Sequence, residues 1–385
     1  MGPLQGITLI EIAGLGPGPF AAMMLADMGA NIIRVERPGG SMFAAADNVK
    51  LDFLNRNKRC ISVNLKEADG VDTVLRLLDQ ADGLLEGNRP GVMERLGLGP
   101  DVCRQRNPKL VYGRMTGWGQ EGPMATEAGH DINYIALAGA LHGIGHAGEK
   151  PAIPLNLVGD FGGGGLLLAF GMVCALLEAK NSGKGQVVDA AMIDGAAALM
   201  ASTFGASQVG FWSDERGTNL LDGGSHFYNT YETADGKYIS LGSIEGQFYE
   251  ALLDKLGQDA AHFENQFDME NWPVMKKQLA DIIRRKTRDE WDEIFAGADV
   301  CYAPVLSMAE VRHHPHHQAR QTFLEDGDVW QPVPAPRFSR TPGEVQRHAA
   351  RIGEHSEEVL REFGFTETEI ESRLENGSVH KLSDN

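Results

Sequence analysis

The sequence predicts an α/β protein with a large domain built on a Rossmann-like, doubly wound parallel sheet and a smaller α+β domain after it. Short apolar runs alternate with helical patterns through residues 1–190, which is typical of parallel strands joined by helices. From residue 227 the pattern changes to a hairpin signal followed by helices. The length of 385 residues exceeds that of one usual hydrophobic core, which favours two domains.

The large domain is expected to alternate strands and helices in a regular order. Strands are expected at residues 7–11, 32–36, 83–86, 110–115 and 186–191, and helices at 19–28, 67–79 and 164–179. The stretches 161–177 and 195–213 carry no charge. The first is shorter than the roughly 20 apolar residues that span a bilayer, and the second is rich in small residues. Both are therefore expected to be buried helices, with no membrane span.

The smaller domain is expected to start with a β-hairpin. A turn signal, Ala234-Asp-Gly236, joins two strand-like runs. Helices are expected at residues 247–256 and 272–285, and another begins at the capping box Thr287-Arg-Asp-Glu290. The expected boundaries are 1–190 for the large domain, 191–226 for connecting helices, 227–325 for the smaller domain, and 326–385 for a linker and C-terminal return to the large domain.

Composition and charge argue against several classes of protein. The formal net charge is -18, whereas a nucleic-acid-binding protein needs a basic face. Apolar residues make up 42% of the chain and charged residues 23%, which is typical of a soluble globular protein. The four cysteines have no paired spacing, so neither a disulfide framework nor a thiolate metal site is expected.

The sequence also bears on localisation and metal binding. The first residues lack the basic and apolar regions of a signal peptide. The terminal Lys381-Leu-Ser-Asp-Asn385 is not a peroxisomal signal, so a cytoplasmic protein is expected. The histidines of His313-His-Pro-His-His317 are adjacent and interrupted by proline, and we expect them to hold no metal.

A glycine-rich turn, Gly14-Leu-Gly-Pro-Gly-Pro19, lies between the first expected strand and helix. It resembles the dinucleotide-binding fingerprint, with Glu36 at the end of the next strand. However, the third glycine of that fingerprint is replaced by Pro19, and two prolines remove N–H donors that a pyrophosphate needs. A tight structural turn is the alternative interpretation, and the indication for NAD is weak.

Basic residues gather near the ends of the expected strands, where ligands bind in open α/β sheets. A phosphorylated ligand such as the ADP part of a cofactor would attract them. Solvated surface charge is the alternative interpretation for any one of them. The residues are Arg34, Arg37, Arg56, Lys58, Arg59, Lys66, Arg89 and Arg95.

Three acid–base candidates stand out. His130 lies in Ala128-Gly-His-Asp-Ile-Asn-Tyr134, and Asp160 precedes a run of four glycines at the start of an apolar helix. Histidine can take and return a proton near neutral pH, but a buried structural histidine and a helix N-cap are equally good interpretations of this pair. Glu245, between a strand and a helix of the smaller domain, could orient a histidine or favour the first helical turn.

Together these motifs resemble CoA-transferases of family III (CaiB/BaiF type), in particular the branch that racemises 2-methylacyl-CoA thioesters. The matching segments run nearly from end to end. They are Gly14–Pro19, Glu36–Pro38, Arg89–Pro100, Thr116–Gln120, Gly129–Tyr134, Val158–Gly164 and Gly353–His355. The resemblance replaces the NAD interpretation, because the Rossmann-like domain of this family binds CoA.

The resemblance implies specific roles. His130 and Asp160 match the two proton-transfer residues, and Glu245 matches the acid that binds the histidine from a partner chain. The family forms an interlocked homodimer and needs no separate cofactor, because CoA is part of the thioester substrate. Asn88 departs from the aromatic residue common in relatives. The implied CoA contacts are Arg37, Val63, Asn64, Leu65, Lys66, Gly87, Asn88, Arg89, Arg95, Gly129, Asp131, Ile132, Asn133 and Tyr134.

Inversion at the α-carbon is simplest with two bases on opposite faces, where one removes the proton and the other returns it. In the alternative, a CoA-transferase of the same fold, the residue at position 160 attacks an acyl-CoA and forms a mixed anhydride. That chemistry needs neither His130 nor Glu245, so their presence favours the racemase. A non-catalytic CoA-binding protein would need neither base. Met192 and Met200 could line an acyl surface or belong to the core.

Overall fold

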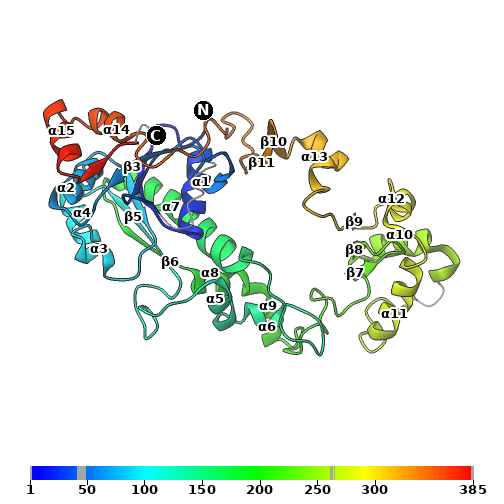
Figure 1. Cartoon of the computed structure of the whole chain (residues 1–385). Coiled ribbons are helices and arrows are strands. Elements are labelled where there is room, and N and C mark those ends of the chain that lie inside the picture. The colour runs from blue at the N-terminus through cyan, green and yellow to red at the C-terminus, as the bar shows by residue number, and fades with distance from the viewer. Residues whose placement is uncertain (1, 41–48, 261–262, 264, 383–385) are drawn as a thin grey trace. The chain divides into compact units, whose positions relative to one another are not determined.

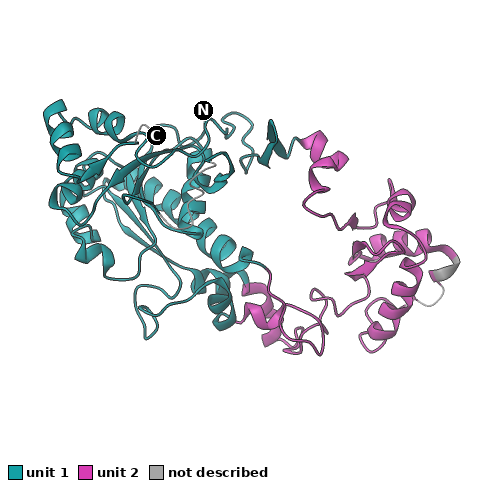
Figure 2. Ribbon diagram, viewed as in Figure 1, with its two compact units in different colours: residues 1–138, 155–199, 321–385 teal, residues 139–154, 200–320 magenta. Residues whose placement is uncertain are grey.

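The computed structural model describes residues 2–40, 49–260, 263 and 265–382. These residues divide into two compact units, which Figure 2 shows in different colours. Unit 1 consists of residues 1–138, 155–199 and 321–385, and unit 2 of residues 139–154 and 200–320. Unit 1 therefore contains both the beginning and the end of the chain.

Unit 1 is built on the doubly wound sheet that the sequence predicts (Figure 1). The strand order β12-β3-β2-β1-β4-β5-β6 has parallel pairs throughout, except that β12 joins antiparallel to β3. The chain builds outward from β1 in one direction and from β4 in the other, so the topological switch point lies between these two strands. The strands are β1 (Thr8–Ile12), β2 (Asn31–Glu36), β3 (Lys58–Val63), β4 (Gly83–Glu86), β5 (Val111–Thr116), β6 (Val187–Ala191) and β12 (Val379–His380).

Two hydrophobic cores cover the two faces of this sheet. Successive strand residues point to opposite faces, so Leu9 packs in one core and Ile10 in the other. One core contains residues of α1 (Pro17–Asp27) and α7 (Leu167–Ser182). The other contains residues of α2 (Ala68–Leu78), α4 (Pro100–Arg106), α14 (Ser356–Glu362) and α15 (Glu367–Glu375).

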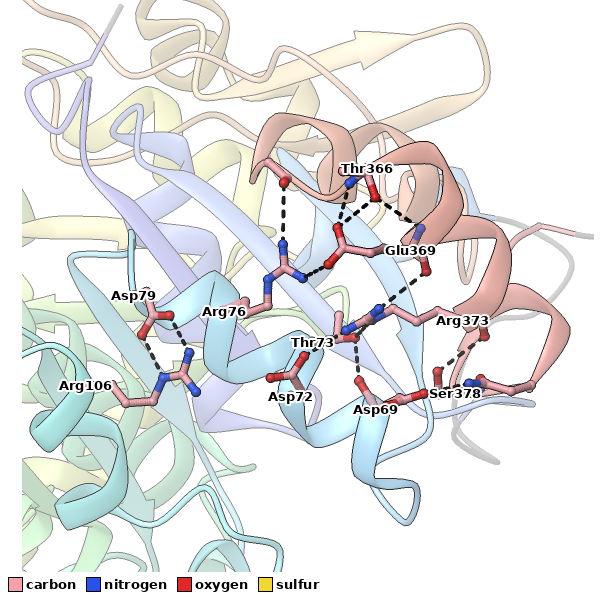
Figure 3. A network of polar contacts seen from close by, with 12 residues as sticks. Asp69, Asp72, Thr73, Arg76, Asp79, Arg106, Thr366, Glu369, Arg373 and Ser378 are labelled. Atoms are coloured by element: carbon pink, nitrogen blue, oxygen red, sulfur yellow. Dashed lines mark hydrogen bonds and ion pairs between the residues drawn. The ribbon is translucent and has the colours of Figure 1, made fainter.

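The end of the chain, α14, α15 and β12, packs on unit 1 and is called the C-terminal clasp (Figure 3). Arg76 of α2 lies 2.7 Å from Glu369, and Arg373 lies 2.8 Å from Asp72 of α2. The chain before the clasp is also fixed to unit 1, because Arg56 bonds to Gln331 at 2.7 Å. A linker was expected to begin at residue 326, but this part of the chain forms a hairpin of β10 (Phe323–Asp326) and β11 (Val329–Pro332), and residues 323–325 were expected in the smaller domain.

Unit 2 contains the predicted hairpin. β7 (Tyr228–Glu232) and β8 (Tyr238–Gly242) pair antiparallel, and β9 (Tyr302–Pro304) extends them. The capping box at Thr287 is confirmed by reciprocal bonds with Glu290 at the start of α12. The helices of unit 2 are α6 (Ala140–Gly143), α9 (Ala201–Gln208), α10 (Gly246–Leu256), α11 (Trp272–Ile283), α12 (Arg288–Phe295) and α13 (Pro315–Arg320).

The apolar helix of unit 1 differs from the prediction in shape and burial. It begins as a π-helix, Leu157–Leu166, and continues as α7. One of its faces was expected to be buried but is exposed, through Leu166, Phe170, Val173 and Leu177. Among the described residues, one stretch, Leu157–Ser182, has the length and composition to cross a membrane; its most apolar 18-residue window has a mean hydropathy of 1.7, and 39% of that window is buried.

Candidate active site

A pocket of about 530 Å³ lies in unit 1 at the carboxyl ends of β1, β4 and β5. The turns after these strands form its walls through Gly14–Pro17, Gly87–Pro90 and Met115–Trp118. The pocket is therefore at the topological switch point, where open α/β sheets bind their ligands. The lining is completed by Ala125, Glu127–His130, Tyr134, Asp160 and Met192.

His130 and Asp160, thirty positions apart in the chain, both line this pocket. The exposed His130 is the N-cap of α5 (Asp131–Leu137), and its main-chain N–H donates to Asn133 Oδ1 at 3.0 Å. Asp160 is half-buried in the π-helix and accepts a hydrogen bond from Asn156 at 3.1 Å. Neither side chain is enclosed in the core, so both are available to a ligand.

Burial raises the pKa of the Asp160 carboxyl above its ordinary value, and the negative charge of Asp131 raises it further. The hydrogen bond from Asn156 and the nearby His130 act in the opposite direction. Burial also raises the pKa of Tyr134. An aspartate with a raised pKa holds a proton more readily, which suits a general acid as well as a base.

Glycines bring backbone segments close to these side chains. Gly16 has a φ of 65°, and a Cβ there would lie 3.2 Å from Asp160 Oδ2. A Cβ on Gly117 would lie 2.1 Å from the Tyr134 ring. The turn Gly14–Pro19 thus packs against Asp160, which supports its interpretation as a structural turn.

The Asp131 side chain does not line the pocket. It is buried, and its Oδ2 accepts the main-chain N–H groups of Gly159 at 2.6 Å and Asp160 at 2.7 Å. If Asp131 contacts CoA as the resemblance implies, it can do so only through its main-chain atoms.

The other implied contact residues divide into two groups. Gly87, Asn88, Arg89, Gly129 and Tyr134 line the pocket. The remaining residues lie outside the pocket lining. Val63 is the last residue of β3 and is buried in the core, and the others follow β2 or β3 or lie on α5 and α3 (Val92–Arg95); these are Arg37, Asn64, Leu65, Lys66, Arg95, Ile132 and Asn133. Glu245 is exposed in unit 2, where it is the N-cap of α10.

The proposed phosphate role is wrong for four members of the basic cluster. Arg56 is buried and lies 2.6 Å from Asp27. Lys58 is buried and lies 2.8 Å from Glu11. Arg34 pairs with Glu36, and Arg59 pairs with Glu358 and Glu362. These cations are held by the protein's own acids.

Sequence reasoning did not select Trp118 and Met115, which line the pocket. The signal was present, because Gly117-Trp-Gly119 follows the strand-like run 110–115 after a single residue. As for metals, no group of three or more histidine, cysteine, aspartate or glutamate side chains gathers anywhere in the described part of the chain.

Comparison with known proteins defines the class. The model of CoA-transferase family III matches residues 4–356, so the chain belongs to this family. It is 47% identical over 369 residues to the α-methylacyl-CoA racemase of Mus musculus and 46% identical over 370 residues to that of Homo sapiens, with 95% of each chain covered. A crystal structure of a CAIB/BAIF family protein from Brucella suis superposes with a TM-score of 0.81 at 25% identity, covering 94% of this chain and 99% of that one.

Proposed function

We propose that this protein racemises 2-methylacyl-CoA thioesters by moving the α-proton between the two faces of the substrate. The observation that carries the proposal is that His130 and Asp160, from separate segments, line one pocket at the switch point. The high identity to racemases over nearly the whole chain supports the same reaction.

In the forward direction His130 accepts the α-proton from one face, and the electron pair of the C–H bond moves into the thioester as an enolate. Asp160, protonated beforehand, then donates its proton to the opposite face of the same carbon. In the reverse direction the two roles are exchanged. The main-chain N–H groups of Asp131 and Ile132, the first two of α5, are suited to stabilise the enolate oxygen, whereas those of Asn133 and Tyr134 already donate to the His130 carbonyl.

CoA is part of the substrate in this proposal, so no separate cofactor is required. Arg89 lines the pocket and is exposed, as are Arg37, Lys66 and Arg95 near the same edge of the sheet. Guanidinium and ammonium groups at this edge are suited to the phosphates of CoA. Binding energy from the nucleotide would then position the reactive thioester.

We propose that Glu245 reaches His130 from a second copy of the chain in a homodimer. An exposed apolar row on the helix of unit 1 supports this assembly: Leu166, Phe170, Val173 and Leu177 recur at helical spacing. Contiguous exposed apolar side chains often mark sites of protein–protein contact. In the dimer Glu245 would stabilise the protonated form of His130.

The second candidate is transfer of CoA between carboxylic acids, with Asp160 as the nucleophile. The accessible carboxyl of Asp160 in the pocket favours it. This reaction leaves the α-proton in place, whereas racemisation exchanges it with solvent.

One experiment separates the two reactions. The purified protein is incubated in heavy water with one enantiomer of a 2-methylacyl-CoA and with an added free carboxylic acid. Racemisation introduces deuterium at the α-position and scrambles the stereocentre. If the α-position keeps its proton while CoA moves to the added acid, the racemase proposal is wrong and the transferase is correct.

Substitution of one base tests the two-face arrangement. His130→Ala is expected to slow deuterium incorporation from one enantiomer more than from the other. Equal losses with both enantiomers would contradict separate faces.

A further inference from the structure

Asp131 is a buried acid next to a proposed catalytic residue, and the proton-transfer scheme gives its carboxylate no role. It directly follows His130 and is only 6% exposed. One of its oxygens, Oδ2, accepts N–H groups from both Gly159 and Asp160. The other, Oδ1, is buried and has no hydrogen-bond partner in the described structure. Because buried carboxylate oxygens are normally satisfied, this placement calls for an explanation.

The sequence at Gly159 is adapted to this contact. A Cβ at Gly159 would lie 2.5 Å from Asp131 Oδ2, so any larger residue would push the carboxylate away. The N–H groups that Asp131 binds belong to the first turn of the π-helix, where a negative charge is favoured. Asp131 thus acts as a cap supplied by another segment. π-helical turns are frequent at functional sites.

The consequence is a short link between the two proposed bases. Asp131 is covalently joined to His130 on one side and hydrogen-bonded to the main chain of Asp160 on the other. Movement of α5 relative to the π-helix would therefore have to break these two short hydrogen bonds. Since a misplacement of about 1 Å can lower a rate by on the order of 10²-fold, such a link matters for proton transfer.

We infer that Asp131 is a positioning residue that fixes Asp160 relative to His130 across the substrate's α-carbon. The inference rests on the proposed racemisation and extends it to a residue outside the pocket lining. The charge of Asp131 has a second effect, because it raises the pKa of Asp160. Asp131 therefore influences both where Asp160 stands and at which pH it holds a proton.

Asp131→Asn tests this inference, because it keeps the shape and removes the charge. Deuterium incorporation is followed separately from each enantiomer and across pH. We expect kcat for the enantiomer that Asp160 deprotonates to fall by about 10- to 100-fold, with KM for the thioester little changed. Exchange from the other enantiomer should fall less. The acidic limb of the Asp160-dependent exchange should move to lower pH, since the neutral amide no longer raises the pKa of Asp160.

A matched control is available at the opposite end of the sheet. Asp82 Oδ2 accepts the main-chain N–H of Thr8 at 2.7 Å, the same type of bond away from the pocket. Asp82→Asn should leave the ratio of the two exchange rates and the pH profile unchanged. If Asp131→Asn lowers both exchange rates equally and keeps the wild-type pH profile, Asp131 is merely structural and the inference is overturned.

A second variant covers the case in which Asp131→Asn does not fold. Gly159→Ala retains every charge, but its Cβ displaces the Asp131 carboxylate, so the same unequal loss is expected. Equal losses of the exchange rate for both enantiomers in Gly159→Ala would also overturn the inference. The wild-type protein is measured first: if it exchanges neither enantiomer, the proposed function fails, whereas an active wild type with unaffected variants refutes the role of Asp131 alone.

Discussion

Two regions of unit 1 use charge in different ways, and the difference shows which ion pairs hold the site. Near the pocket, Lys58 and Glu11 form a pair that is 1% and 2% exposed. Lys58 also donates to the carbonyl of Pro19 at 3.1 Å, which fixes the first turn of α1 beside the pocket. On α2 and α4, the helices that share a core with the C-terminal clasp, Arg106 and Asp79 form a pair that is 36% exposed on both sides (Figure 3).

The contrast is between a buried ion pair, which fixes the geometry of its surroundings, and an exposed ion pair, which contributes little to the fold. A buried charge that loses its partner is strongly unfavourable, so a pair such as Lys58–Glu11 permits one arrangement only. An exposed pair can exchange its partner for water at little cost. The buried pair near the pocket should therefore respond sharply to single substitutions and the exposed Arg106–Asp79 pair weakly.

The largest effect is expected from Asp160→Asn. Loss of this proposed proton-transfer group should lower the rate of racemisation by about 10²- to 10⁴-fold, while thermal unfolding changes little. Chiral analysis of the thioester measures the rate. Asp79→Asn in the clasp region is the matched control and should retain full activity; a loss of less than tenfold in Asp160→Asn would contradict the assignment.

The pH profile of the wild-type protein gives a second test of the role of Asp160. Because burial raises the pKa of Asp160, exchange that uses Asp160 as the base should decline on acidification at a higher pH than an ordinary aspartate would allow. Exchange that uses it as the acid should decline as the pH rises through that pKa. Initial rates of deuterium incorporation from each enantiomer, measured across pH, provide the test.

Lys58→Met should have the largest effect on stability, about 3–5 kcal/mol, because it leaves Glu11 buried without its cation. Urea unfolding measures the change. Burial raises the pKa of Glu11, so the penalty should be smallest at acid pH, where Glu11 is protonated, and should grow as the pH rises. The double variant Lys58→Met, Glu11→Leu should recover much of the loss; no recovery would mean that packing rather than charge is responsible.

Arg373→Ala in the clasp should have an intermediate effect. Arg373 is buried and donates to Thr73 at 3.0 Å as well as to Asp72. Loss of hydrogen bonds of this kind is expected to lower the free energy of unfolding by about 1–3 kcal/mol. Racemase activity below the unfolding transition should remain that of the wild type, and a large loss of activity would show that the clasp acts on the pocket.

The smallest effect is expected at the exposed pair of Arg106 and Asp79. Arg106→Ala should change the free energy of unfolding by about 0.2–1 kcal/mol. High salt should remove even this difference, because exposed charges are screened. An effect as large as that of Lys58→Met would break the contrast between the two regions.

The fold was predictable from the sequence wherever apolar periodicity was clear, and β4 begins and ends as expected at 83–86. Strand β3 was missed because Lys58 and Arg59 at its start have the charge of surface residues. Their burial becomes evident only when the sheet brings Glu11 of β1 within reach of Lys58. Local sequence cannot show this, because β2 separates the two strands in the sheet.

The two main candidate residues of the site could be selected from the sequence, but the residue that holds them in place could not. His130 and Asp160 stood out by residue type and by the glycines beside Asp160, and the structure places both in one pocket. The contact of Asp131 with the Asp160 main chain depends on how α5 meets the π-helix. Spacing along the chain does not show that these two segments make contact. It also does not show that one face of the apolar helix is exposed.

The position of β12 has a consequence for the order of synthesis. This strand covers the outer edge of β3. Unit 1, whose strand β1 is synthesised before any part of unit 2, therefore cannot be completed until residues 379–380 have emerged. Unit 2, made entirely of residues before 321, has all its residues available sooner. An unpaired strand edge invites association with other chains. Until residues 379–380 have emerged, the nascent chain therefore presents an open edge at β3.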